Sequence, residues 1–149
     1  MIQVKLKNDV REFEAGISAA EVAKSISMGL YKACCACEIN GVVCDLRTPL
    51  TENCQVTFLT FDDKEGQKVF WHTASHILAQ AVKHLYPNAM FWVGPVIEEG
   101  FYYDVDLGDV KLTEEDLPKI GKKMAALVAS GEKVKRFEVS KEEALNLFK

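Results

Sequence analysis

Asn40-Gly41 gives the strongest turn signal in the chain, because it stands between two short runs in which apolar and polar side chains alternate. Asparagine and glycine tolerate the positive φ angles that a two-residue hairpin turn requires. The runs on either side, residues 32–39 and 42–46, are therefore predicted to be two antiparallel strands. One face of the first strand would carry Ala33, Cys35, Cys37 and Ile39.

Two segments with the same alternation begin the chain. Residues 2–6 and 10–13 flank the turn-like Lys7-Asn8-Asp9, and they are predicted to pair as another hairpin. After this hairpin, Ser18 is expected to cap a short helix whose apolar side chains recur at helical spacing. That helix is predicted to end at Ser27-Met28-Gly29.

A last alternating run, residues 55–61, completes a pattern of two strands, one helix and three further strands. This order within so short a segment is typical of a β-grasp, the ubiquitin-like arrangement of a mixed sheet packed against a helix. We therefore predict an α+β fold with a β-grasp domain over residues 1–61. The polar segment 62–66 marks the start of a second α+β domain, residues 62–149.

The second region alternates helical and strand-like patterns. Asp62 or Asp63 is expected to cap a long helix that ends near Tyr86. The later patterns predict strands at 89–93 and 101–105 around a loop at 94–100. A helix from 113 to 129 and a strand at 134–139 are predicted to follow. The last predicted helix runs from Ser140 to Lys149 and opens with a capping box between Ser140 and Glu143.

The sharpest chemical pattern is His72-Thr73-Ala74-Ser75-His76 within the long predicted helix. Residues four apart differ in direction by about 40° around a helix, so both imidazoles point the same way. The opposite side is apolar and expected to be buried, through Leu78, Ala81, Val82 and Leu85. Such a histidine pair can bind a metal ion, position or deprotonate a water molecule, or occupy a solvated face. No glutamate follows His72, which argues against a zinc protease.

Two longer segments carry a family resemblance. Residues 72–83, with the sequence HTASHILAQAVK, resemble the editing-domain helix of the threonyl-tRNA synthetases. Residues 94–104, with the sequence GPVIEEGFYYD, are similar to the next signature of that family, at a matching spacing. Residues 1–61 resemble the TGS domain that precedes the editing domain in this family.

The resemblance implies the N-terminal region of a threonine–tRNA ligase: a TGS domain, then the incomplete front part of a domain that hydrolyses mischarged seryl-tRNA(Thr). Serine lacks only one methyl group of threonine, and a binding site rejects that loss by only about 1–3 kcal/mol, so a hydrolytic site is useful. The resemblance further implies that His72 and His76 line this catalytic site, with Tyr103 near them. Tyr103 would hydrogen-bond the substrate, although a packed tyrosine with a satisfied hydroxyl fits almost equally well.

The same resemblance implies parts that these 149 residues do not contain. The family completes its editing site with a later Cys-x-x-x-His element, and no cysteine follows Cys54. An aminoacylation domain with ATP, magnesium and zinc, and a homodimeric assembly, are expected of the full-length parent. For the present region we expect no cofactor and no metal. Its expected partner is the acceptor end of tRNA(Thr), carrying threonine or serine.

Composition limits the class of protein further. The net charge of −4 is ill suited to holding RNA through its phosphates alone. No apolar stretch resembles a membrane span or a signal peptide, so a cytoplasmic protein without membrane attachment is expected. The cysteines lack the paired spacing of a zinc site, and we expect reduced, mostly buried thiols at Cys34, Cys35, Cys37, Cys44 and Cys54.

Two other interpretations stay open on the sequence alone. The first is a stand-alone β-grasp module with a binding or regulatory role and no catalysis. The second is a trans-editing protein of the alanyl-tRNA synthetase editing type, whose related HxxxH site binds zinc. An N-terminal β-grasp is not expected in the second type. Bound zinc in this chain would favour it.

Overall fold

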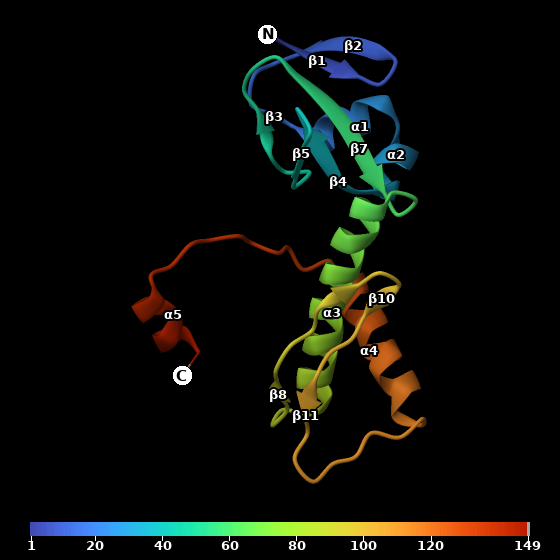
Figure 1. Cartoon of the computed structure of the whole chain (residues 1–149), viewed down its shortest axis with the longest axis vertical. Helices are drawn as coiled ribbons and strands as arrows, with labels where there is room; N and C mark the ends of the chain where they lie inside the picture. Colours follow the sequence, from blue (N-terminus) through green and yellow to red (C-terminus); the bar gives the residue numbers. More distant parts are fainter. Residues whose placement is uncertain (149) are drawn as a thin grey trace.

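The computed structural model describes residues 1–148. Figure 1 shows an elongated molecule with a five-stranded sheet and two short helices at one end. The long helix α3 (Lys64–Leu85) leads from this sheet to a second group of elements. The predicted α+β class is therefore confirmed. Within the described residues, no helix is long and apolar enough to cross a membrane.

The first unit is built on a mixed sheet with the strand order β2-β1-β7-β4-β5. β1 (Ile2–Leu6) pairs antiparallel with β2 (Asp9–Phe13) and parallel with β7 (Cys54–Thr60). β4 (Cys34–Ile39) pairs antiparallel with β7 on one side and with β5 (Val42–Cys44) on the other. The first and last long strands of the unit thus lie side by side in the sheet, and the predicted β-grasp is confirmed.

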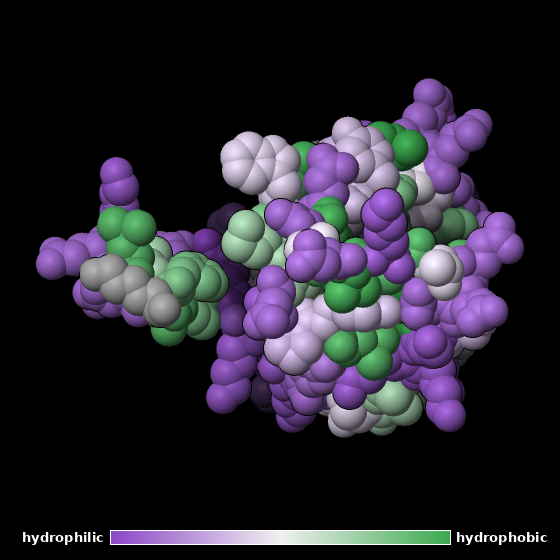
Figure 2. Space-filling model, turned by 90° about the horizontal axis from the view of Figure 1, so that it is seen from below, coloured by the Kyte–Doolittle hydropathy of each residue, from purple (hydrophilic) through white to green (hydrophobic). Residues whose placement is uncertain are grey.

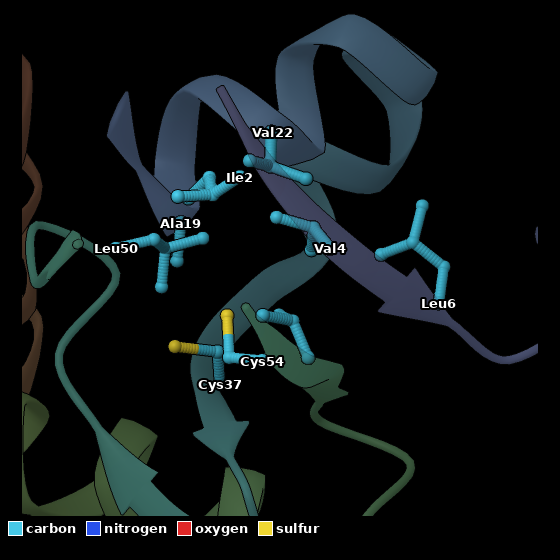
Figure 3. Close-up of a cluster of buried hydrophobic side chains, with 9 residues drawn as sticks. Ile2, Val4, Leu6, Ala19, Val22, Cys37, Leu50 and Cys54 are labelled. Carbon is cyan, nitrogen blue, oxygen red and sulfur yellow. The ribbon is translucent and has the colours of Figure 1, made fainter. Parts of the chain in front are cut away.

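The core of this unit lies between the sheet and α1 (Ala19–Ile26). β1 alternates buried and exposed side chains along its whole length, so it turns one apolar face toward the helix. Figure 3 shows Val4 of β1 close to Val22 of α1, with the thiols of Cys37 and Cys54 in the same cluster. Cysteine therefore serves here as a small apolar side chain.

Two local predictions for this unit are confirmed. Ser18 caps α1 in a capping box, because its Oγ accepts from the backbone N–H of Glu21 and its own N–H donates to the Glu21 carboxylate. At the β4–β5 turn, Asn40 has a φ of 51° and Gly41 a φ of 84°. These are the positive angles that a two-residue hairpin requires.

The segment between α1 and β4 differs from the prediction. The chain forms a second helix, α2 (Met28–Ala33), whose N-terminus is capped by Ser27. The strand begins only at Cys34, and its pairing with β7 shifts register between Cys34 and Ala36. Ala33 belongs to α2, and Cys35 lies at the register shift, so the predicted face of alternate residues is wrong for these two. Cys37 and Ile39 both pack in the core of the first unit, as predicted.

Two short strands were not predicted. β3 (Ile17–Ser18) pairs antiparallel with β6 (Pro49–Leu50) beside the main sheet. Strands of two residues contain no alternation, so the sequence pattern gives no sign of them.

The second unit packs α4 (Asp116–Ser130) against α3. Two short antiparallel pairs lie in front of these helices in Figure 1: β8 (Met90–Phe91) pairs with β11 (Val105–Asp106), and β9 (Val96–Ile97) pairs with β10 (Gly100–Phe101). The buried core of this unit consists of Ala81, Val82, Ala89 and Ile120.

Several predictions for the second unit need correction. Its strands are shorter than the predicted 89–93 and 101–105, and the predicted loop at 94–100 contains β9. Of the four side chains predicted to be buried on α3, Ala81 and Val82 are buried and Leu78 is partly buried. Leu85, the last residue of the helix, is 39% exposed, so its predicted burial is wrong.

The end of the chain stands apart from both units. Residues 132–140 have no regular secondary structure, so the strand predicted at 134–139 is wrong. α5 (Lys141–Leu147) follows and is capped by Ser140 and Glu143 as predicted, whereas the predicted end at Lys149 lies outside the described residues. α5 buries none of its residues, and Figure 2 shows it away from the body with hydrophobic side chains in view.

Candidate functional site

The two predicted histidines meet on the surface of α3. The Nε2 atoms of His72 and His76 are 3.1 Å apart, and their rings meet edge to face with centroids 4.7 Å apart. Both side chains are exposed, so neither belongs to the apolar core. A hydrogen bond between two Nε2 atoms requires one ring to donate and the other to accept. The two rings therefore share one proton between their Nε2 atoms.

The helix itself keeps this pair out of the core. Ser75, between the two histidines, faces inward and is only 2% exposed. Its Oγ donates to the carbonyl oxygen of His72 at 2.7 Å, which satisfies the buried hydroxyl within the helix. Ala81 and Val82 continue the buried side two turns later. The separation of the two sides follows from the sequence through helical spacing alone.

His72 also lines an open groove of about 760 Å³ between the first half of α3 and the β9 strand. Its walls are mainly apolar, with charged and polar side chains along them. The α3 wall includes Lys64, Lys68, Trp71 and His72. The β9 wall consists of Val96 and Ile97 of the strand and of Glu98, which follows it. His76 lies beside this groove through its contact with His72.

Tyr103 lies elsewhere in the second unit. Its half-buried ring meets Phe91 edge to face, with centroids 5.5 Å apart. Together with Leu78, Val82 and Ile120 it lines a different cavity, of about 420 Å³, between α3 and α4. The structure thus brings His72 and His76 together and does not place Tyr103 in their groove. Tyr103 is also outside a strand, between β10 and β11.

Sequence reasoning missed the other residues of the groove. Lys64 and Lys68 precede His72 at steps of four, so the helical spacing that paired the histidines could also have identified them. The β9 wall had no such signal, because its position depends on a tertiary contact between the hairpin and α3. Lys68 is held by Glu65 at 2.7 Å, which neutralises part of the local positive charge.

The five thiols are free, as predicted, but only Cys37 and Cys54 are buried. The predicted burial is wrong for the half-buried Cys34, Cys35 and Cys44. Burial raises the pKa of Cys37 to about 11, and the neighbouring Cys44 adds to this shift. Burial likewise raises the pKa of Cys34 to about 11. A thiol with so high a pKa is rarely the thiolate that binds metals or attacks substrates. Within residues 1–148, no group of three or more His, Cys, Asp or Glu side chains is placed to hold a metal ion.

The comparisons with known proteins extend over both units. Residues 2–60 match the family model of the TGS domain. The whole chain is 48% identical over 150 aligned residues to the threonine–tRNA ligase of Clostridioides difficile, covering 100% of this chain and 23% of that protein. Over its whole length, the chain is similar to threonine–tRNA ligases, and it aligns with 23% of the length of such a protein. The resemblance found in the sequence is thereby confirmed.

Two further ligases of this family show the same extent of similarity. That of Finegoldia magna is 45% identical, covering 100% of this chain and 24% of the relative. That of Bacteroides fragilis is 45% identical, covering 93% of this chain and 22% of the relative. The chain therefore spans about a quarter of the length of these relatives. The TGS match ends at residue 60, and the predicted domain extents of 1–61 and 62–149 stay predictions.

Proposed function

We propose that this chain serves as the N-terminal region of a threonine–tRNA ligase, and that it contributes to hydrolysis of mischarged seryl-tRNA(Thr). The observation that carries the proposal is the 3.1 Å contact between the Nε2 atoms of His72 and His76 beside an open groove. The similarity to threonine–tRNA ligases along the whole chain supports the choice of substrate.

Hydrolysis of an aminoacyl ester requires a water molecule aimed at the ester carbonyl and an acceptor for its proton. Because the two Nε2 atoms bond directly at 3.1 Å, the rings must separate to admit a water molecule. That water would then accept a hydrogen bond from the protonated Nε2 and donate one to the unprotonated Nε2. The first bond orients the oxygen toward the ester, and the second allows a proton to leave as the oxygen attacks. The ribose hydroxyl at the end of the tRNA is the leaving group and takes up a proton.

The groove supplies the place for the substrate end. Its mainly apolar walls suit the sugar and base of a nucleotide, while His72 lies within it. The partners in this proposal are the acceptor end of tRNA(Thr) and its seryl or threonyl group. Tyr103 lines another cavity, so its predicted contact with the substrate has no support in this geometry. ATP, magnesium, zinc and the homodimeric assembly belong, in this proposal, to the remainder of the ligase.

The test is a chimeric ligase in which this chain replaces the corresponding region of the Clostridioides difficile enzyme, which is 48% identical to it. Release of labelled serine from seryl-tRNA(Thr) is measured for the chimera and for its His72→Ala and His76→Ala variants. General acid–base groups contribute about 10²–10⁴-fold, so each variant should lose deacylation within that range. His84→Ala is the matched control, because His84 is an exposed histidine of α3 that does not line the groove.

The outcomes separate the competing interpretations. Unchanged deacylation in both histidine variants would overturn the editing role and favour a β-grasp module that only binds. Zinc retained by the purified 149-residue chain, and lost on replacing His72 or His76, would favour the trans-editing type. Aminoacylation by the chimera is measured in parallel, so that a general loss of folding is recognised.

A further inference from the structure

The segment that joins the sheet to α3 contains an unusually close backbone approach. Gly66, in the first turn of α3, is buried against the end of β7. A Cβ at this position would lie 1.9 Å from the carbonyl oxygen of Thr60 and 2.7 Å from its carbonyl carbon. The obstructing atoms are backbone, so no side-chain movement relieves the contact. Only glycine lets the helix begin in this position.

A second tie connects the same two places through a side chain. Asp63 occupies the cap position of α3, yet its carboxylate makes no hydrogen bond to the helix. Its Oδ2 accepts instead from the backbone N–H of Thr60 at 2.8 Å and from Thr60 Oγ1 at 3.4 Å. The N–H of Asp63 in turn donates to the Thr60 carbonyl at 3.0 Å. Asp63 therefore makes no side-chain capping bond to α3 and binds the end of β7 instead.

Aromatic rings make a third tie on the outside of the joint. Phe61 meets Phe70 edge to face, with centroids 5.1 Å apart, and meets Trp71 in the same way at 5.8 Å. Edge-to-face contacts of this kind are favourable beyond the burial of the rings. Trp71 also lines the groove and is the neighbour of His72, so the ring cluster reaches the candidate site directly.

We infer that residues 60–71 form a rigid joint that fixes the direction in which α3 leaves the sheet. Flexible domain linkers are typically rich in small or polar residues and make few contacts across them. Here a backbone contact, a side-chain clamp and an aromatic cluster act between the same two elements, and α3 packs against β4 as well. The sheet and the first half of α3 therefore move as one body.

The joint makes Gly66 and Asp63 positioning residues for the histidine pair. A ligand that touches both the first unit and the groove would meet one rigid surface, with His72 at a constant place on it. This consequence for hydrolysis rests on the proposed function, whereas the rigidity of the joint does not.

The test measures orientation in the 149-residue chain by backbone N–H residual dipolar couplings. Couplings from residues 2–60 and from α3 should fit a single alignment tensor. Gly66→Ala should break this agreement or rotate α3 relative to the sheet. The matched control is Gly121→Ala, because Gly121 also lies inside a helix but an added Cβ there meets nothing within 4 Å. It should leave the single tensor unchanged.

A second pair of variants keeps the test decisive where Gly66→Ala fails to fold. Asp63→Ala removes the acceptor for Thr60 and should loosen the joint, while Asp63→Asn keeps an acceptor oxygen and should restore the wild-type tensor. A wild-type chain that already needs two tensors would overturn the inference. Residual dipolar couplings unchanged from those of the wild-type chain in both Gly66→Ala and Asp63→Ala would also overturn the inference.

The same variants test whether the joint affects hydrolysis at the candidate site. The His72–His76 contact lies within one helix, so the imidazole nitrogen shifts should stay unchanged in Asp63→Ala. A displacement of about 1 Å can cost about 10²-fold in rate, so deacylation by the chimeric ligase should fall by up to that factor and return with Asp63→Asn. Loss of deacylation in His72→Ala but not in Asp63→Ala would support the hydrolytic role and show that the joint does not contribute to it.

Discussion

The backbone of Gly94 lies directly against the ring of Tyr103: a Cβ at residue 94 would be 2.5 Å from Cδ2 and 2.6 Å from Cε2 of that ring. The same ring packs edge to face on Phe91. Tyr103 thus has a clear packing role between the β8 and β11 regions. This contact explains why glycine precedes proline in the 94–100 segment without any reference to a substrate.

We expect Gly94→Ala to destabilise the chain by about 1–3 kcal/mol, the usual cost of forcing an extra methyl group into a packed site. The cost should shrink when Tyr103→Ala is present, because the ring that the methyl group meets is then gone. Urea unfolding of the two single variants and the double variant gives the three free energies of unfolding. An equal cost of Gly94→Ala with and without the ring would contradict the contact.

The features that could be predicted from the sequence are those that depend on residues close together in the chain. The Asn40-Gly41 turn, the helix cap at Ser18 and the capping box at Ser140 were predicted at the residues where they occur. Each depends on side chains within three residues of the backbone groups they satisfy. The i, i+4 contact of His72 and His76 is predictable for the same reason.

Features that depend on distant partners were missed. α2 replaces a predicted turn and strand start, and β9 interrupts a predicted loop. The alternation at 134–139 is typical of a strand, yet a strand requires a neighbour, and none pairs with it within the described residues. The groove beside His72 also escaped prediction, because one of its walls is the β9 strand.

The unpaired segment 134–139 gives a direct prediction for hydrogen exchange. Arg47 Nη1 of the first unit donates a hydrogen bond to the carbonyl oxygen of Val134 at 2.6 Å. This bond protects no amide of the segment, so residues 135–139 should exchange at close to the rate of an unfolded chain. The amides of β1, paired on both sides, should exchange far more slowly. Slow exchange at 135–139, measured by NMR, would reveal a partner strand.

The thiols of Cys34 and Cys37 should react slowly in the folded chain. The thiolate is the reactive form, and burial raises the pKa of both Cys34 and Cys37 to about 11. At pH 8, modification by an aromatic disulfide reagent should therefore leave these two residues largely intact until urea unfolds the chain. Mass spectrometry of the digested protein assigns the modified sites over time. Modification of Cys37 in the native chain as fast as in the unfolded chain would refute its burial.

Asp116 should make the chain sensitive to strong acid. Its Oδ2 accepts from the N–H and the Oγ1 of Thr113, and Lys119 Nζ donates to its Oδ1 at 3.1 Å. The backbone bond from Thr113, aided by Lys119, lowers the pKa of Asp116 to about 2. The carboxyl of an unfolded chain has a pKa of about 3.9. The unfolded state therefore binds a proton first as the pH falls.

The stabilisation that this carboxylate gives is consequently complete above about pH 4 and is lost as the pH falls toward about 2. Asp116→Asn cannot ionise, so its free energy of unfolding should fall less steeply over that window than that of the wild-type chain. Urea unfolding at a series of pH values gives both slopes, and the carboxyl carbon shift of Asp116 gives its pKa independently. Other carboxylates titrate alike in the two proteins, so the difference belongs to Asp116. Parallel slopes, or a carboxyl shift that titrates near the ordinary aspartate value, would show that the start of α4 is not held by this side chain.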